Sequence, residues 1–291
     1  MKLASSELIL NPDGSIYHLQ LKPGEVADTV ITVGDQDRVE QVSKHFDTIE
    51  VKAQHREFKT HTGTLNGKRI TVVSTGIGPD NIDIVFNELD ALVNIDFLTR
   101  EIKTEKKSLS IIRVGTSGAL QPEVSIDSFI ASEIGIGFDN LLHFYGNTET
   151  IFEEKLSQAF VNHTEWNPNN AQPYAVKADP DLLSLFITNS TILKGITATN
   201  VGFYGPQGRV LRLPLHDAAM NAKIASFEYH GGKITNLEME TAAMYGMAKL
   251  LGHKAISLNA ILANRSIGTF SENPSETIDK LIMYTLKILT Q

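Results

Sequence analysis

Three short apolar segments, each running directly into a glycine-rich turn, constrain the fold most. They are residues 30–33 before Gly34-Asp35, residues 69–74 before Thr75-Gly76-Ile77-Gly78, and residues 110–114 before Gly115-Thr116-Ser117-Gly118. Segments that are apolar on both faces and bounded by turns are typical of buried strands in parallel or mixed sheets. The sequence therefore predicts a buried sheet with glycine turns at its strand ends.

Helical patterns occupy the sequence between and beyond these segments. Residues 81–93 place their large apolar side chains on one face, residues 241–251 are rich in helix formers, and residues 281–289 predict a C-terminal helix. Strands that alternate with helices indicate an α/β fold. We predict a central mixed β-sheet flanked by helices, with the ligand site at the ends of the strands.

The remaining segments do not indicate a second domain. Residues 99–108 are charged and are expected to be a solvated insertion. Residues 162–173 are rich in turn formers and are expected to be a surface loop. The sequence contains neither an internal repeat nor a low-complexity segment. We therefore predict one domain that spans residues 1–291.

Composition excludes several classes of function. The 291 residues carry a formal net charge of −8, which argues against a nucleic-acid partner because such a surface needs clustered Lys and Arg. The chain has no cysteine, so neither a disulfide nor a thiolate metal site can form, and its nine histidines include no H-E-x-x-H pair. No apolar run is long enough for a signal sequence or a membrane span, so we expect no membrane partner and a cytoplasmic location.

Two arginines could bind an anion, one shortly after an apolar strand and one inside such a strand. Gly34 lets backbone N–H groups approach an anion, and Arg38 lies one turn further along the chain. Arg113 lies inside an apolar strand, where an unpaired guanidinium is costly to bury. It could pair with a phosphate, helped by the N–H groups and hydroxyls of the turn at 115–118, or with a buried carboxylate. The residues alone leave both possibilities open.

Two further segments carry side chains suited to a nucleoside. Phe203 could stack on a planar base while Gln207 and Arg209 reach its carbonyl and imide edge, although ordinary loop structure explains the same string. In an extended segment Glu238 and Glu240 point the same way, and carboxylates are good partners for vicinal ribose hydroxyls. The alternative for these two residues is a helix N-terminus, where acidic groups favour the macrodipole.

Eight short motifs, taken in order, cover nearly the whole chain. They are Tyr17-His18-Leu19, Gly34-Asp35-x-x-Arg38-Val39, His55-Arg56-Glu57-Phe58, Ser74-Thr75-Gly76-Ile77-Gly78, Arg113-x-Gly115-Thr116-x-Gly118-Ala119, Phe203-Tyr204-x-x-Gln207-x-Arg209, Glu238-Met239-Glu240 and Asn264-Arg265. Their order resembles that of the nucleoside phosphorylase superfamily, and specifically of its uridine phosphorylases. The resemblance implies an α/β fold with a central mixed sheet. It also implies a homodimer, or a hexamer built from dimers, with shared active sites.

The resemblance implies roles for individual residues. The phosphate site would comprise Gly34, Arg38, Arg113, Thr116 and, from the neighbouring subunit, Arg56. The ribose would be held by Met239, Glu240 and, again from the neighbour, His18. The base would be held by Phe203, Gln207 and Arg209. The residues expected to act in catalysis are Arg113, Gln207, Arg209 and Glu240.

The implied reaction is reversible phosphorolysis of a pyrimidine nucleoside, with uridine as the expected substrate, to the free base and ribose 1-phosphate. The expected partners are a nucleoside and inorganic phosphate as co-substrate, and no cofactor is expected. Purine-cleaving relatives commonly have an aspartate acid where this chain has Asn264, which favours a pyrimidine. The alternatives are a purine nucleoside phosphorylase, a catalytically silent nucleoside-binding protein, and a phosphate-independent nucleosidase, a class that lacks the arginine set.

Two departures from the family pattern affect the expected ligands. The turn Gly78-Pro79-Asp80-Asn81 replaces the usual Gly-Gly-Pro-Ser. We therefore do not expect the monovalent cation that some relatives hold at the dimer interface, near this turn and near the glutamate matching Glu57. Gly208 stands where a glutamate is frequent, and residues 210–220 follow the family poorly. These differences bear on the choice of base more than on catalysis.

Overall fold

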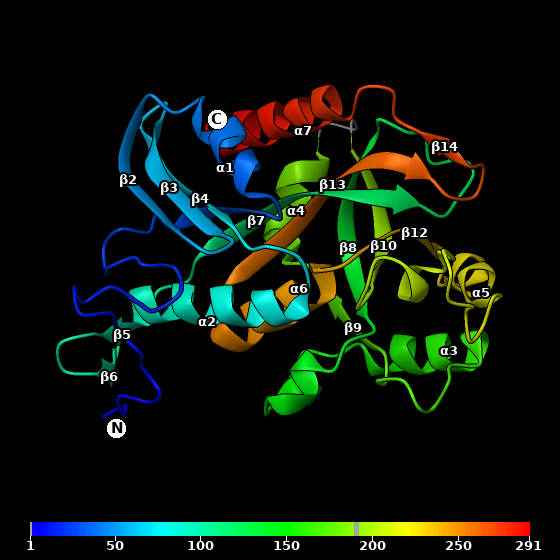
Figure 1. Cartoon of the computed structure of the whole chain (residues 1–291), viewed down its shortest axis with the longest axis horizontal. Coiled ribbons are helices and arrows are strands. Elements are labelled where there is room, and N and C mark those ends of the chain that lie inside the picture. Colours follow the sequence, from blue (N-terminus) through cyan, green and yellow to red (C-terminus); the bar gives the residue numbers. More distant parts are fainter. Residues whose placement is uncertain (1, 189–191) are drawn as a thin grey trace.

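The three predicted strands lie at the centre of one mixed sheet (Figure 1). The computed structural model describes residues 2–188 and 192–291, and twelve strands of these residues form the sheet. In sheet order the main path is β11 (Glu228–Tyr229), β12 (Gly232–Glu238), β10 (Leu193–Thr199), β8 (Phe129–Gly137), β13 (Lys254–Asn264), β7 (Ser110–Ala119), β1 (Thr29–Val33), β4 (Lys68–Ser74), β3 (Phe58–Leu65) and β2 (Thr48–His55). Off this path, β9 (Tyr174–Lys177) pairs with β8 and β14 (Thr269–Phe270) pairs with β13.

Burial on both faces explains why the central strands form where the apolar segments predict them. All five residues of β1 are buried, and β1 pairs in parallel with β4 on one side and with β7 on the other. Because these three strands run in the same direction, their carboxyl ends meet at one edge of the sheet. The turns that contain Gly34 and Gly76 are thereby brought beside the carboxyl-terminal half of β7.

The segment at residues 115–118, predicted to be a turn, instead continues β7. Strand β13 pairs in parallel with β7 as far as Ala119, and β12 pairs antiparallel with Gly118 and Ala119. Strand β1 pairs with β7 only as far as Arg113. Long-range pairing therefore extends the strand, because a glycine-rich string adopts whichever backbone its neighbours impose. Among the described residues, one edge of β7 has no partner strand between Arg113 and Gly118.

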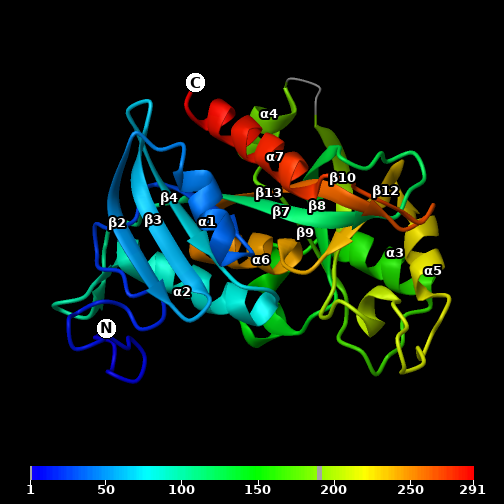
Figure 2. The same ribbon diagram turned by 45° about the horizontal axis from the view of Figure 1, so that its top comes forward.

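Helices cover both faces of the sheet (Figures 1 and 2). Helices α1, α4 and α7 pack on one face, α2 and α6 pack together on the other, and α3 and α5 lie beside β9 and β12. The α-helices are α1 (Gln36–Ser43), α2 (Pro79–Asn94), α3 (Glu154–Thr164), α4 (Pro180–Ile187), α5 (Met220–Ser226), α6 (Thr241–Leu251) and α7 (Pro274–Leu289). Single 3₁₀ turns are η1 (Leu141–Phe144), η2 (Thr148–Thr150) and η3 (Gly205–Gln207).

The helix ends follow local signals in the sequence. Helix α6 coincides with the predicted range and ends at Gly252, whose φ of 80° suits a residue without a Cβ. Helices α2 and α7 begin earlier than predicted, because Pro79 and Pro274 occupy their first turns. Proline is favourable there, since the N–H that it lacks would have no partner within the helix.

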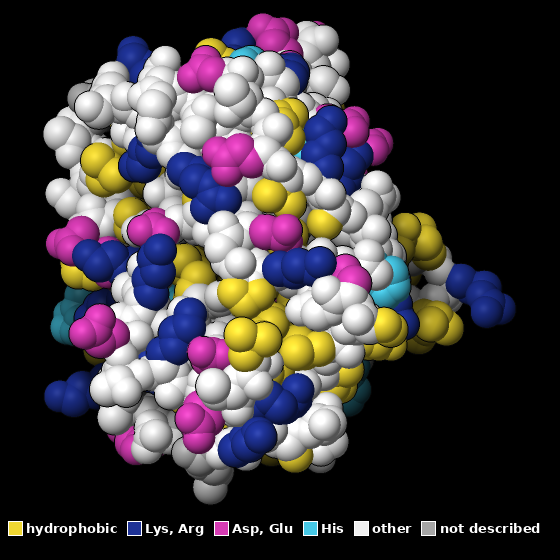
Figure 3. All heavy atoms as spheres, turned by 90° about the vertical axis from the view of Figure 1, so that its left-hand side faces the viewer, with side chains coloured by type: hydrophobic (Ala, Val, Ile, Leu, Met, Phe, Trp, Pro, Cys, Tyr) yellow, Lys and Arg dark blue, Asp and Glu magenta, His cyan; other side chains and the backbone are white. Residues whose placement is uncertain are grey.

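The two predicted surface segments lie outside the core. Residues 101–108 are all exposed and begin with β6 (Glu101–Ile102), which pairs with β5 (Ile95–Asp96) in a small hairpin. The first three residues of 162–173 complete α3, and the rest form a loop. Lys and Arg are interspersed with Asp and Glu over the side of the molecule that carries β2 (Figure 3). No helix in the described part of the chain is long and apolar enough to cross a membrane.

Candidate active site

A cavity of about 980 Å³ lies at the carboxyl ends of the central strands. Its walls come from the turns after β1 and β4, from the second half of β7, and from the junction between β12 and α6. The predicted site residues that line it are Gly34, Arg38, Arg113, Thr116, Phe203, Gln207, Arg209, Met239 and Glu240. Residues predicted for the phosphate, ribose and base subsites therefore share one cavity, although they come from distant parts of the sequence.

Arg38 is a half-buried cation that forms no ion pair with a carboxylate of the described residues. It lies in the first turn of α1, and its Nη1 donates only a long hydrogen bond, of 3.4 Å, to the Val114 carbonyl. Its Nε is buried without a partner, and no carboxylate of the described residues forms an ion pair with it. Burial and the nearby charge of Arg113 lower the pKa of the Arg38 guanidinium. A partly desolvated cation of this kind favours a bound anion.

The backbone beside Arg38 supplies further donors. The Val114 carbonyl faces Arg38 across the edge of β7 that β1 leaves free. Alternate residues of a strand direct their backbone groups to the same edge, so the Thr116 N–H lies on this side too. Gly34, which follows β1, also lines the cavity. An anion between these groups would meet one unpaired guanidinium and backbone N–H donors.

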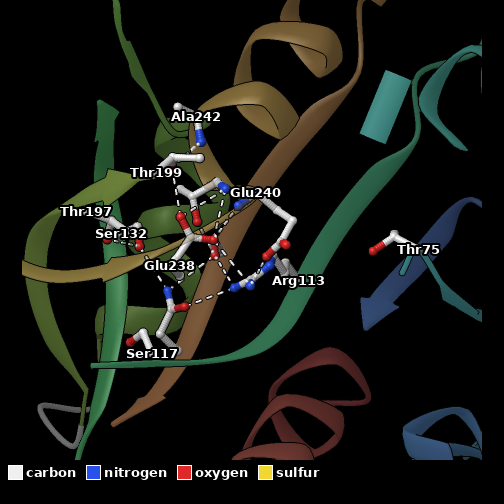
Figure 4. A network of polar contacts seen from close by, with 12 residues as sticks. Thr75, Arg113, Ser117, Ser132, Thr197, Thr199, Glu238, Glu240 and Ala242 are labelled. Atoms are coloured by element: carbon white, nitrogen blue, oxygen red, sulfur yellow. Dashed lines mark hydrogen bonds and ion pairs between the residues drawn. The ribbon is translucent and has the colours of Figure 1, made fainter. Parts of the chain in front are cut away.

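Arg113 differs from Arg38 because its guanidinium is held on several sides (Figure 4). Its Nη2 lies 2.5 Å from Glu240 Oε2 and 3.2 Å from Glu238 Oε2. Its Nη1 donates to Asn259 Oδ1 at 2.9 Å and to Ser257 Oγ at 3.3 Å. Of the two possibilities that the sequence left open, pairing with a buried carboxylate is therefore present, and it involves two carboxylates. Arg113 is 6% exposed, and it still lines the cavity.

Glu238 and Glu240 face the same guanidinium but have different local roles. Glu238 accepts hydrogen bonds from the backbone N–H groups of Glu240 and Thr241 and from Thr199 Oγ1, so it caps the start of α6. Glu240 accepts from the Gly78 N–H at 2.8 Å, which ties the turn after β4 to α6. Burial raises the pKa of Glu240 more than Arg113 lowers it. The two interpretations of this pair are therefore compatible: both carboxylates line the cavity, and both lie at the N-terminus of α6.

The segment at residues 203–209 forms the opposite end of the cavity. The Arg209 guanidinium lies 3.8 Å from the centre of the Phe203 ring, in a cation–π contact. Its Nη1 donates to Gln207 Oε1 at 2.6 Å. Since Arg209 occupies that oxygen, Gln207 Nε2 remains as a donor. Arg265 also donates to the Gln207 carbonyl, and burial lowers its pKa. This end of the cavity therefore presents donors to a ligand.

Asn264 does not face the cavity, which changes the argument built on it. Its Nδ2 donates to the carbonyls of Gln121 and Val124, and its Oδ1 accepts from the N–H groups of Ser266 and Ile267. The side chain is 1% exposed and is fully used in holding the turn after β13. Gln207 and Arg209, the residues predicted to bind the base, do line the cavity.

His18 and Arg56, the residues expected from a neighbouring subunit, do not line the cavity of their own chain. His18 is half-buried, and its Nδ1 lies 2.7 Å from Glu88 Oε1. Arg56 is exposed in the turn between β2 and β3, where its φ is 53°. Their contribution to an active site stays a prediction.

Two residues of the site have no role in the expectations drawn from the sequence. Asn259 accepts a hydrogen bond from Arg113. The sequence signal that could have identified it is an amide side chain in the interior of the apolar segment at 254–264. Arg265 supports residues 203–209, and it was noted only as part of the motif Asn264-Arg265. In residues 2–188 and 192–291, no three His, Asp or Glu side chains cluster as they would around a metal ion.

Comparison with known proteins identifies the family. The sequence model described as "Phosphorylase superfamily" matches residues 28–290. The chain belongs to this superfamily. A uridine phosphorylase of Thermococcus kodakarensis is 29% identical over 100% of this chain and 92% of its own, and the Escherichia coli uridine phosphorylase is 27% identical over 95% and 96%. The crystal structure of a Trypanosoma brucei nucleoside phosphorylase, described as showing uridine phosphorylase activity, superposes with a TM-score of 0.87 at 29% identity and covers 97% of this chain and 99% of its own.

Gly115 provides a direct test of the site. A Cβ at this position would lie 2.0 Å from Arg113 Nη1 and 2.4 Å from its Cζ, so Gly115→Ala must displace the guanidinium. We expect kcat/KM to fall at least about tenfold, because the displaced guanidinium no longer holds Glu240 in place and a misplaced charged group loses most of its hydrogen-bond energy. Steady-state kinetics at varied phosphate would measure it. Gly146→Ala, where a Cβ meets nothing within 4 Å, is the matched control and should leave the kinetics unchanged.

Proposed function

We propose that this chain catalyses the phosphorolysis of a pyrimidine nucleoside, with uridine as its best substrate, to the free base and ribose 1-phosphate. The observation that carries the proposal is Arg38, a half-buried guanidinium that forms no ion pair with a carboxylate of the described residues and lines the same cavity as Gly34 and Thr116. Membership of the phosphorylase superfamily and the uridine phosphorylases among the relatives support it.

The two ends of the cavity suit the two halves of this reaction. Phosphate held by Arg38, Gly34 and Thr116 would be positioned for attack on C1′, which makes a bimolecular step effectively intramolecular. Glu240, which Gly78 and Arg113 hold in place, would accept hydrogen bonds from the ribose hydroxyls, with Met239 beside the sugar. As the glycosidic bond stretches, C1′ gains positive charge, to which the phosphate dianion is complementary.

The leaving base gains negative charge, and residues 203–209 present donors to it. Gln207 is 2% exposed and its amide is oriented by Arg209, while Phe203 is 52% exposed and already carries the Arg209 guanidinium on its ring. Fixed donors stabilise a developing anion without reorganising during the reaction. A pyrimidine base accepts such donors at its carbonyl oxygens, so no acid is needed at position 264. This arrangement favours a pyrimidine nucleoside.

A substrate panel tests the proposal. Uridine, thymidine and inosine are assayed side by side with and without phosphate, and release of the free base is measured together with formation of the pentose 1-phosphate. We expect uridine to be cleaved fastest and only when phosphate is present. Cleavage in phosphate-free buffer would instead indicate a nucleosidase, inosine as the best substrate would indicate a purine nucleoside phosphorylase, and no cleavage of any nucleoside would leave a binding protein.

We further propose that each site is completed by a neighbouring subunit, through its Arg56 and His18. Both side chains lie outside the cavity of their own chain, and Arg56 is exposed. Arg56 would add a second free cation to the phosphate end. His18, whose Nδ1 is held by Glu88, would offer its Nε2 to the ribose 5′-hydroxyl. The assembly would then be a dimer or a hexamer of dimers, and a monomer would be inactive.

Mixing two inactive variants tests whether the sites are shared. Arg38→Met and Arg56→Ala should each abolish most activity, whereas subunit exchange between them should restore about a quarter of it. The reason is that half of the dimers are then hybrids, and one of the two sites in each hybrid has both arginines intact. Activity is measured before and after exchange, with each variant alone as the control. A mixture that stays inactive after confirmed exchange contradicts the shared site.

A further inference from the structure

Ser117 is one of the two hydroxyl residues at 115–118, and the resemblance to the family gives it no role of its own. It lines the cavity between Thr116, at the phosphate end, and Gly118, which lies against the Arg265 side chain at the base end. Arg113, Gly115 and Ser117 share one face of β7, because side chains alternate along a strand. The hydroxyl of Ser117 is therefore on the same face as the Arg113 guanidinium, which lies over Gly115.

A buried chain of hydrogen bonds connects Arg113 to Ser117, and part of it is drawn in Figure 4. Its members are otherwise isolated from water, since Asn259, Ser132, Thr197 and Asn236 are all 0% exposed. The links are Arg113 Nη1 to Asn259 Oδ1 at 2.9 Å, Asn259 Nδ2 to Ser132 Oγ at 3.0 Å, Ser132 Oγ to Thr197 Oγ1 at 2.5 Å, Thr197 Oγ1 to Asn236 Oδ1 at 2.9 Å, and Asn236 Nδ2 to Ser117 Oγ at 3.0 Å.

The guanidinium sets the direction of every bond in this chain. A guanidinium can only donate, so Asn259 must accept with Oδ1 and donate with Nδ2. Ser132 Oγ then accepts a hydrogen bond from Asn259 and donates one to Thr197 Oγ1. Thr197 in turn donates to Asn236 Oδ1. Thr235 Oγ1 donates to the same oxygen at 2.8 Å. Asn236 therefore directs Nδ2 at Ser117, and every donor along the chain has an acceptor.

The consequence is that Ser117 accepts from the protein and has its own proton free. No described residue accepts a hydrogen bond from the Ser117 hydroxyl. Hydrogen bonds in series polarise one another in a low-dielectric interior, so a chain that begins at a cation makes its last hydroxyl a better donor. The positive charge of Arg113 thus polarises the Ser117 hydroxyl, which lines the same cavity nearer to residues 203–209.

We propose that Ser117 is a substrate-contacting residue, whose hydroxyl donates to the carbonyl oxygen of the leaving base next to the glycosidic nitrogen, O2 in uridine. The inference rests on the proposed phosphorolysis. Negative charge grows on O2 as the glycosidic bond breaks, so the hydrogen bond is stronger in the transition state than in the bound nucleoside. The hydroxyl keeps its proton throughout. Thr197 acts as a positioning residue, because it reaches the substrate only through Asn236 and Ser117.

The experiment compares two substrates, uridine and 2-thiouridine, which differ only in the acceptor at position 2. Ser117→Ala should lower kcat/KM for uridine about tenfold, mainly through kcat, the effect of losing one neutral hydrogen bond. It should lower kcat/KM for 2-thiouridine much less, since sulfur is a weak acceptor. Ser117→Thr keeps the hydroxyl and should retain most of the activity. Ser125→Ala, at an exposed serine, is the matched control.

Thr197→Val tests the chain itself. It should lower kcat for uridine about twofold in the Ser117 protein and leave kcat unchanged in the Ser117→Ala protein, because coupled residues do not act additively. Equal losses of Ser117→Ala on uridine and 2-thiouridine, or no loss at all, would overturn the assignment while leaving phosphorolysis intact. Failure of the unmodified protein to cleave uridine with phosphate would overturn the proposed function, and this assignment with it.

Discussion

Arg113→Met is expected to reduce turnover by about 10³-fold, the upper scale for one well-placed donor. It should also lower the free energy of unfolding by about 3–5 kcal/mol, because it leaves buried charges without their partner. The charges are Glu238 and Glu240, which both lie against the Arg113 guanidinium. Phosphorolysis kinetics and chemical denaturation at pH 7 measure the two effects separately.

The pH dependence of the stability of Arg113→Met checks that the buried carboxylates cause its destabilisation. Without Arg113, burial and mutual repulsion should raise the pKa of Glu240 further above its usual range. The folded variant then holds a proton that the unfolded chain releases, so its stability falls as pH rises through that raised pKa and recovers toward pH 5. Adding Glu238→Gln and Glu240→Gln should restore about half of the lost stability and none of the activity. Unchanged stability in Arg113→Met would contradict the buried ion cluster.

Arg38→Met is expected to reduce kcat/KM for phosphate by about 10²- to 10³-fold without destabilising the protein. The Arg38 side chain is half-buried, its buried Nε has no hydrogen-bond partner among the described residues, and burial lowers the pKa of the guanidinium. Removing such a group relieves the cost of desolvating an unpaired cation. Thermal unfolding without phosphate should therefore occur at the same temperature as in the unmodified protein, or at a higher one.

The effect of added phosphate on thermal stability tests whether Arg38 binds the anion. Millimolar phosphate should raise the Tm of the unmodified protein, since a ligand that binds only the folded state stabilises it. The same addition should leave the Tm of Arg38→Met unchanged. Arg212→Met, at an exposed arginine, is the matched control and should behave like the unmodified protein. An Arg38→Met protein that keeps its response to phosphate would exclude Arg38 as the anion ligand.

Much of the fold could be predicted because its determinants are local. Strand β1 and helix α6 have a consistent pattern of burial along their whole length, so periodicity and turn residues suffice to locate them. The far end of β7 could not be predicted in this way. Its glycines permit a turn, and only pairing with β13 and β12, which come much later in the sequence, holds residues 115–118 extended.

For the site, the side chains that are available could be read from the sequence: the arginines after or within strands, the donors of residues 203–209, and the two carboxylates before α6. The sequence could not determine their partners. The folded structure shows that Glu238 and Glu240 bind Arg113, whereas Arg38 forms no ion pair with any described residue. The physical reason is that ion pairing and desolvation depend on distances of a few ångströms between segments that are remote in the chain, and these distances exist only once the sheet has formed.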